Sequence, residues 1–306
     1  MCGHVGFAGE HKEADKIITF LLVLDSTRGT DGTGLFMTSF SKKGECLIKE
    51  SGDCYNLINN KNYNVVNNSY NLFIGHNRAS TRGHNTPSNS HPFNLGRIVG
   101  AHNGTLSNFY TLPLYKYYDV DSELALFMIG SEGVEKAVKQ FRGSWSFVWY
   151  DRKEKTLNFL RNEERPLCYT FDTEGNLYWA SEEWMLEATF KKFNIEYSPI
   201  VSTTPDSLYT FGFNEHKKPT LISITPDIKG KEETLTTYSK YYHPVVGGIP
   251  TSREETKGKK KEILCSCCGD VYSKSDIAYG YHVYVGGVPE ERFVCKDCDD
   301  LYNRGN

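Results

Sequence analysis

The chain opens with Met1-Cys2-Gly3-His4-Val5-Gly6-Phe7-Ala8, which puts a thiol at position 2 and a short β-forming run directly behind it. A small residue at position 2 favours removal of Met1, and that step would leave Cys2 with a free α-amine beside its thiol. With an unperturbed pKa of roughly 7.7–8.0, such an amine can accept the thiol proton near neutral pH. Cys2 could therefore supply both a nucleophile and its base, and no separate histidine is required.

Further motifs follow this opening, and their order along the chain is the informative feature. They are Arg28-Gly29-Thr30-Asp31-Gly32-Thr33-Gly34-Leu35, Gly75-His76-Asn77-Arg78-Ala79-Ser80-Thr81-Arg82-Gly83, His91-Pro92-Phe93, Ala101-His102-Asn103-Gly104-Thr105-Leu106-Ser107-Asn108, Asp121-Ser122-Glu123, Arg142-Gly143-Ser144, Arg165-Pro166-Leu167 and Ala180-Ser181-Glu182. Together with the opening, this series resembles the glutaminase domain of class II glutamine amidotransferases, above all that of amidophosphoribosyltransferase. No single motif is decisive, but the ordered set is highly specific.

The resemblance implies roles that fit the chemistry of amide hydrolysis. Attack on a carboxamide builds negative charge on its oxygen, which calls for hydrogen-bond donors that are fixed in advance. The family forms this oxyanion hole from the positions that match the Asn103 side-chain amide and the Gly104 backbone N–H. A glycine at that position lets the backbone approach the substrate without an intervening Cβ.

Free glutamine also needs a partner for each of its charged ends. A guanidinium suits the α-carboxylate and a carboxylate suits the α-ammonium. The family gives these roles to the positions that match Arg78 and Asp121. The resemblance also places Thr81 in the substrate pocket, and Arg28 where the family has an arginine that helps to arrange the nucleophile's surroundings.

Taken singly, these residues have ordinary interpretations. These are a tight turn at Asn103-Gly104, an ion-pair former at Arg78, a helix cap at Asp121 or Ser122, and structural histidines at His76, His91 and His102. Two positions also depart from the sugar-phosphate-aminating branch of the family, which has Trp where this chain has Ala79 and His where it has Arg82. The reaction type is therefore better specified than the shape of the pocket rim.

The resemblance implies hydrolysis of glutamine to glutamate and ammonia through a γ-glutamyl thioester on Cys2, with no cofactor needed for this step. Nothing after about Thr225 resembles an acceptor domain such as a phosphoribosyltransferase or a sugar isomerase. We therefore expect ammonia to pass to a synthase on another chain. Two other hypotheses stay open. One is a stand-alone N-terminal-nucleophile amidohydrolase that acts on a γ-glutamyl or other amide, and the other is a catalytically silent scaffold protein of the same fold.

Periodicity divides residues 1–225 into many short strands and few helices. The expected strands are His4–Ala8, Gly34–Ser39, Leu72–His76, Arg97–Ala101, Ser144–Tyr150, Leu157–Arg161, Leu177–Ala180 and Ser207–Phe213. The expected helices are Lys12–Ser26, Ser122–Ile129, Val134–Phe141 and Glu183–Phe193. Because no regular βαβ rhythm appears, the pattern favours α+β layers. The resemblance implies a four-layer αββα N-terminal-nucleophile hydrolase sandwich.

Bulk composition excludes several classes of protein. A chain of 306 residues with 39% apolar content can bury one large core, or one large core and a small appendage. The longest apolar run, Ile17–Leu24, is too short to span a membrane, and the N-terminus lacks a signal-peptide pattern, so we expect a cytoplasmic protein. A net charge of -3 and a pI near 6.3 give no electrostatic reason to expect a nucleic-acid partner.

The C-terminal residues carry a second signal. The pairs Cys265-x-x-Cys268 and Cys295-x-x-Cys298 have the spacing of a four-thiolate zinc ribbon, with Cys267 or His282 as substitute ligands. We expect a hairpin from the Tyr279–Val285 and Arg292–Val294 runs, which Gly286-Gly287 separates. Because four thiolates leave no open position, the Zn2+ would be structural, and the module would stabilise the chain or dock a partner.

We therefore expect a glutaminase domain over 1–225, an irregular segment and charged linker over 226–262, and a zinc ribbon over 263–306. The linker prediction rests on the almost wholly polar run Ser252–Glu262. Residues 251–306 carry nine Lys or Arg against ten Asp or Glu, a balance that argues against a nucleic-acid partner for the ribbon as well.

Overall fold

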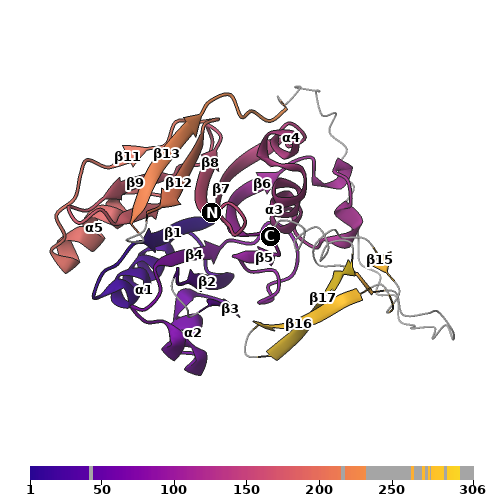
Figure 1. Cartoon of the computed structure of the whole chain (residues 1–306), viewed down its shortest axis with the longest axis horizontal. Coiled ribbons are helices and arrows are strands. Elements are labelled where there is room, and N and C mark those ends of the chain that lie inside the picture. The colour runs from indigo at the N-terminus through magenta and orange to yellow at the C-terminus, as the bar shows by residue number, and fades with distance from the viewer. Residues whose placement is uncertain are drawn as a thin grey trace, which may run out of the picture.

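The computed structural model describes residues 1–40, 44–214 and 218–231, together with 263–264, 271–272, 275, 277–285 and 288–296 near the C-terminus. Up to residue 231, the chain forms two antiparallel β-sheets that stack face to face, with helices packed on the outer face of each sheet (Figure 1). The expected α+β class is therefore confirmed, and the layers follow the order helix, sheet, sheet, helix.

The first sheet has a fully buried strand near its middle. In spatial order its strands are β11 (Val201–Ser202), β9 (Cys168–Phe171), β10 (Leu177–Ala180), β1 (Gly3–Ala8), β4 (Leu72–Arg78), β2 (Gly32–Thr38) and β3 (Glu45–Ser51). Every residue of β1 is buried, because helices cover one face of the sheet and the second sheet covers the other. The small and apolar residues of this strand suit burial on both faces.

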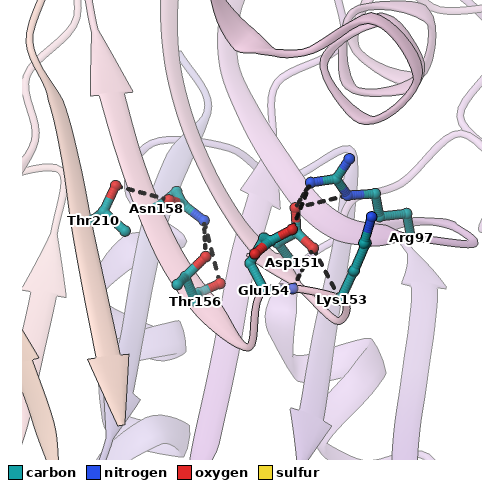
Figure 2. A network of polar contacts seen from close by, with 7 residues as sticks. All are labelled: Arg97, Asp151, Lys153, Glu154, Thr156, Asn158 and Thr210. Atoms are coloured by element: carbon teal, nitrogen blue, oxygen red, sulfur yellow. Dashed lines mark hydrogen bonds and ion pairs between the residues drawn. The ribbon is translucent and has the colours of Figure 1, made fainter. Parts of the chain in front are cut away.

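The second sheet pairs its two longest strands side by side. Its spatial order is β13 (Pro219–Thr225), β12 (Leu208–Phe213), β8 (Thr156–Arg161), β7 (Gly143–Asp151), β6 (Ile98–Leu106) and β5 (Phe93–Leu95). A polar network closes the turn between β7 and β8 (Figure 2). There the Asp151 carboxylate pairs with Arg97 at 2.8 Å and accepts the N–H groups of Lys153 and Glu154.

Helices on the two outer faces complete three apolar cores. Helices α1 (Ala14–Asp25) and α5 (Glu183–Phe193) cover the first sheet, α3 (Asp121–Glu132) and α4 (Val134–Val138) cover the second, and α2 (Cys54–Ile58) lies beside β2 and β3. Short 3-10 turns are η1 (Lys61–Val65), η2 (Phe109–Thr111) and η3 (Tyr115–Tyr117). Phe36, Ile74, Phe159 and Trp179 are among the residues that fill the space between the sheets. Among the described helices, none has the length and apolarity needed to cross a bilayer.

Every strand and helix expected in residues 1–225 is present, although several ends differ. The third expected helix is shorter than predicted, because α4 ends at Val138 while Phe141 is buried beyond it. The expected cap at Asp121 or Ser122 is wrong. Val120 is the N-cap and makes no side-chain cap bond, and the Asp121 carboxylate instead accepts the N–H of Leu106.

Beyond residue 231 the structure describes two strand pairs. Strand β14 (Ile263–Leu264) pairs with β15 (Val271–Tyr272), and β16 (Ile277–Val285) pairs with β17 (Val288–Cys295), both antiparallel. The second pair confirms the expected hairpin. Cys265, Cys267, Cys268 and Cys298 lie outside the described residues, as does the expected linker Ser252–Glu262. In the part of the chain that is described, no cluster of His, Cys, Asp or Glu could hold a metal ion, so the zinc site stays a prediction.

Candidate active site

Cys2 immediately precedes β1 and is buried, with 8% exposure. The Ala79 N–H donates to Cys2 Sγ at 3.3 Å, and the thiol donates to the Ala79 carbonyl, also at 3.3 Å. Burial raises the pKa of the thiol, while the Ala79 N–H and the charge of Arg78 lower it. Met1, in contrast, is 69% exposed, so the residue that must be removed to free the Cys2 α-amine projects into solvent.

Arg28 follows α1 and lies directly against Cys2. Its Nε donates to the Cys2 carbonyl at 2.9 Å, and its Nη1 pairs with the Glu182 carboxylate. The arginine is itself buried, so its position is well determined by these partners. The structure thus brings Arg28 and the predicted nucleophile together, and the contact holds the main chain of Cys2, not its thiol.

The segments 28–31 and 78–80 pack against each other, so two of the motifs form one unit. A Cβ on Gly29 would lie 2.4 Å from the carbonyl carbon of Arg78, so only glycine fits there. The Asp31 N–H donates to the Arg78 carbonyl at 2.9 Å, and the Asp31 carboxylate accepts the Ser80 N–H at 2.7 Å. These contacts explain the Arg-Gly-x-Asp spacing: Arg28 reaches Cys2 while the next residues hold the loop after β4.

Arg78 is buried at the end of β4. Its guanidinium donates to two carbonyls of the following loop, those of Arg82 and His84, the latter at 3.0 Å. Burial lowers the pKa of Arg78, and the Cys2 thiol and the Asp121 carboxylate oppose this shift. Arg78 therefore lies in the electrostatic field of both the predicted nucleophile and the predicted ammonium-binding residue, and it also holds the 79–84 loop.

Asn103 and Gly104 lie on β6, in the sheet opposite to Cys2. Asn103 is only 1% exposed, and its Nδ2 is a buried donor that has no partner among the described residues. Gly104 has a φ of 150°, and a Cβ there would lie 2.0 Å from the Ser144 carbonyl oxygen. Gly104 is therefore a strained strand position that only glycine can occupy, and Asn103-Gly104 does not form the tight turn that Asn-Gly often forms.

His4 connects the two sheets near these residues. Its Nε2 donates to the Ser146 carbonyl at 2.8 Å, and Ser146 is the register partner of Asn103 in the β6–β7 pair. Because His4 is two residues from Cys2, the nucleophile and the unpaired Asn103 donor lie toward the same end of facing strands. Burial lowers the pKa of His4 and of His102 to about 3, so both rings are neutral at physiological pH.

Asp121 and Thr81 border the stretch of β6 just beyond Gly104. Asp121 is the first residue of α3, and its Oδ2 accepts the Leu106 N–H at 2.7 Å. Burial raises the pKa of this carboxyl, although the hydrogen bond lowers it. Thr81 is exposed, and its Oγ1 accepts a hydrogen bond from Thr105 Oγ1 at 3.2 Å. The structure thus places Thr81 and Asp121, two of the three predicted substrate-binding residues, beside the predicted oxyanion hole.

Two features of this site escape sequence analysis. The first is the pair of main-chain groups of Ala79 that contact Cys2 Sγ, which no side-chain pattern can indicate. The second is Asp25, a fully buried carboxylate next to Gly3. The helical pattern could have indicated its burial, since Asp25 follows Ile18 by seven residues and therefore lies on the apolar face of the predicted helix.

Comparison with known proteins gives one family match. Residues 76–188 match the family model described as "Glutamine amidotransferase domain". The matched segment contains Arg78, Asn103, Gly104 and Asp121, whereas Cys2 and Arg28 precede it.

Three curated relatives are isomerizing glutamine–fructose-6-phosphate aminotransferases. The relative from Streptococcus pyogenes serotype M3 is 26% identical over 226 residues, which is 68% of this chain and 36% of the relative. The relative from Streptococcus pneumoniae serotype 4 is 25% identical over 271 residues, or 82% and 43%. The relative from Thermococcus kodakarensis is 32% identical over 230 residues, or 68% and 36%. The chain thus spans less than half the length of these relatives.

Among solved structures, a similar fold occurs in the glutamine phosphoribosylpyrophosphate amidotransferase from B. subtilis complexed with ADP and GMP. The match has a TM-score of 0.55 and 22% sequence identity, and it covers 72% of this chain and 49% of the other. At this level of identity, the likeness concerns the fold alone.

Proposed function

We propose that this chain, which carries a glutamine amidotransferase domain, hydrolyses glutamine through Cys2 and delivers the ammonia to an acceptor enzyme on another chain. The observation that carries the proposal is the buried Nδ2 of Asn103, which has no hydrogen-bond partner among the described residues. It lies on a strand that faces the nucleophile's strand. An unpaired buried donor costs stability, about 1–3 kcal/mol. A site that must stabilise an oxyanion needs such a donor before the substrate arrives.

The first step is activation of the thiol. Because burial raises the pKa of Cys2, the thiolate is scarce at neutral pH and a base is required. Removal of the exposed Met1 supplies this base, since the freed α-amine accepts the thiol proton and becomes an ammonium. The thiolate then attacks the carboxamide carbon of glutamine. Retention of Met1 would leave an amide nitrogen that cannot accept the proton, which is the condition for the catalytically silent alternative.

The next steps move charge and protons within the same small volume. As the C–S bond forms, the carboxamide oxygen becomes an oxyanion, to which the Asn103 amide and the Gly104 N–H donate. The α-ammonium of Cys2 gives its proton to the leaving nitrogen, the C–N bond breaks, and ammonia departs from a γ-glutamyl thioester. A water molecule, deprotonated by the same amine, attacks the thioester carbonyl, releases glutamate and restores the thiol.

Recognition of glutamine falls to the residues around the end of β6. Arg78 binds the α-carboxylate, because its guanidinium has five N–H groups and the carbonyls of Arg82 and His84 use only part of them. Asp121 binds the α-ammonium, and that charge would counter the effect of burial on the carboxyl. Thr81, at the exposed edge, closes this side of the pocket.

A separate acceptor chain is part of this proposal. The names of the curated relatives indicate amino transfer from glutamine to a sugar phosphate, and this chain spans less than half of their length. We further propose a cytoplasmic location. In its support, the cysteines described up to residue 231, which are Cys2, Cys46, Cys54 and Cys168, are all free thiols.

We propose one structural Zn2+ held by Cys265, Cys268, Cys295 and Cys298. The described backbone supports the arrangement, because the first two cysteines fall in sequence between the paired strands β14 and β15, and Cys295 ends β17. Four thiolates would close the coordination shell, so the metal would stabilise this segment or present a docking surface, with no part in glutamine hydrolysis.

The experiment that tests the proposal combines Cys2→Ala with intact-mass analysis. We expect the wild-type protein to begin at Cys2, to gain one adduct at Cys2 from a diazo-ketone analogue of glutamine, and to release ammonia from glutamine. Cys2→Ala should form no adduct and release no ammonia while it melts at the wild-type temperature. Cys168→Ala, a buried thiol on β9, is the matched control and should keep full activity. Glutamine hydrolysis by Cys2→Ala at the wild-type rate would refute the proposal.

A further inference from the structure

Asp25 is a buried carboxylate for which the proposed reaction has no use so far. It ends α1, and its side chain is fully buried. The backbone N–H and the Nδ2 of Asn77 donate to its Oδ2 at 3.2 and 3.0 Å, whereas its Oδ1 has no partner within the described chain. Because a buried carboxylate with an unpaired oxygen is costly to keep, the position calls for a reason beyond packing.

The unpaired oxygen lies directly behind the nucleophile. A Cβ on Gly3 would lie 1.8 Å from Asp25 Oδ1, so the carboxyl group packs against the main chain of the residue bonded to Cys2. Arg28, three residues further along the chain and beyond the end of α1, donates to the Cys2 carbonyl. Asp25 and Arg28 thus hold the start of β1 between them, and the charge of Asp25 acts on the Cys2 thiol.

The surroundings of Asp25 bring the pKa of its carboxyl close to neutral pH, so that both the protonated and the ionised form are accessible. Burial raises its pKa to about 7, while the donors of Asn77 and the charge of Arg28 lower it and Glu182 raises it. The C-terminal end of α1 adds a further partial negative charge that disfavours the carboxylate. The charged and titratable groups that face Asp25 are Cys2 before β1, Arg28 after α1, Cys54 of α2 and Glu182 before α5.

We propose that Asp25 is a positioning residue for the nucleophile: its carboxylate, fixed by Asn77 behind the Cys2–Gly3 peptide, sets how readily the Cys2 thiol and its freed α-amine exchange a proton. The inference rests on the proposed function, because it requires a free amine at Cys2. A nearby anion stabilises an ammonium and opposes a thiolate. Ionised Asp25 therefore makes the α-amine a stronger base and keeps the thiol protonated until that base takes the proton.

The test compares wild type with Asp25→Asn and uses Asp172→Asn as a matched control. Asp172 is also buried and hydrogen-bonded, by Asn176 and Tyr178, but it lies at the turn between β9 and β10. One readout is kcat/KM for glutamine as a function of pH. The other is the rate of Cys2 alkylation by iodoacetamide as a function of pH, located by mass spectrometry. Intact mass verifies in each protein that Met1 is gone.

In Asp25→Asn we expect the acidic limb of kcat/KM and the midpoint of Cys2 alkylation to move to lower pH by roughly one unit, since loss of the anion lowers the pKa of both amine and thiol. Asp172→Asn should leave both midpoints in place. If Asp25→Asn lowers only the melting temperature and neither midpoint moves, Asp25 is merely structural and the proposal is overturned. Should this variant not fold, Asp25→Ser makes the same comparison with a smaller uncharged side chain.

The two readouts distinguish failure of the proposed glutaminase activity from failure of the proposed role of Asp25. A wild-type protein that releases no ammonia would overturn the proposed function, whereas the alkylation curve would still report on Asp25. A midpoint that moves in Asp25→Asn in such a protein would uphold the coupling between this carboxylate and Cys2.

Discussion

Replacing Asn103 by alanine should separate catalysis from stability. In the protein without substrate, the Nδ2 of Asn103 has no hydrogen-bond partner among the described residues, so this donor is available to a substrate. In the reaction it would donate to the oxyanion, and loss of one such donor raises the activation free energy by about 2.7–4 kcal/mol, or lowers kcat by roughly 10²–10³. KM should change little, because this contact strengthens only as the charge develops.

The free energy of unfolding should hardly change in the same variant. Truncation removes the packing of a small side chain, but it also removes a buried unpaired donor whose cost is about 1–3 kcal/mol. These contributions oppose each other, and we expect a net change within about 1 kcal/mol. Asn158→Ala is the matched control, because Asn158 is also buried in the same sheet but donates to Thr156 and accepts from Thr210 (Figure 2). That variant should lose stability and keep kcat.

The assay is steady-state release of ammonia from glutamine, measured beside urea unfolding of both variants. A wild-type kcat in Asn103→Ala would refute the reasoning. So would a loss of activity that unfolding of the variant accounts for.

Acid should destabilise the fold, because His4 and His102 have pKa values lowered to about 3 and the unfolded chain then binds protons that the folded chain does not. As the pH falls from about 6.5 toward 3, each histidine should lower the free energy of unfolding by about 1.4 kcal/mol per pH unit. The pKa of Asp25 is raised to about 7, so its protonation favours the folded state as the pH falls, and this effect offsets that of one histidine. Urea unfolding at a series of pH values measures the net slope, and a flat profile would contradict it. Elemental analysis should find one zinc per chain, which Cys268→Ser should release without loss of basal glutaminase activity; a folded protein without zinc would disprove the site.

The sequence pattern could predict eight strands and the α+β class because these strands are largely buried and carry dense apolar runs, as Leu72–His76 does, whereas the sandwich itself was implied by the family resemblance. Five strands within residues 1–225 were not predicted, and each is a poor example of the pattern. Strand β3 is an edge strand with Glu45, Lys49 and Glu50 in its seven residues, and β13 is an edge strand that is mostly exposed. Strands β5, β9 and β11 are only three, four and two residues long. Edge strands bury one face at most, so the hydrophobic signal weakens.

Close contacts restrict the residue type at two positions of the motifs. At Gly29 and Gly104 a Cβ would collide with main-chain atoms, which accounts for glycine in the sequence pattern there. The helix cap at Asp121 failed because capping depends on where a side chain points, and this one points to the main chain of Leu106. Asp25 was missed because a charged residue within an apolar helical pattern passes as an exposed position when its phase is not checked.

The packing of segment 28–31 against segment 78–80 limits how this protein can be re-engineered. Gly29 and Asp31 shape the chain around Arg78 and Ser80, and the same segment carries the arginine that holds Cys2. If the 78–80 segment were replaced by that of a relative, it would therefore lack the matching 28–31 segment whose contacts hold it in place. The two segments must therefore be exchanged together. Recombination that separates them would disturb both the residues proposed to recognise glutamine and the position of the Cys2 thiol.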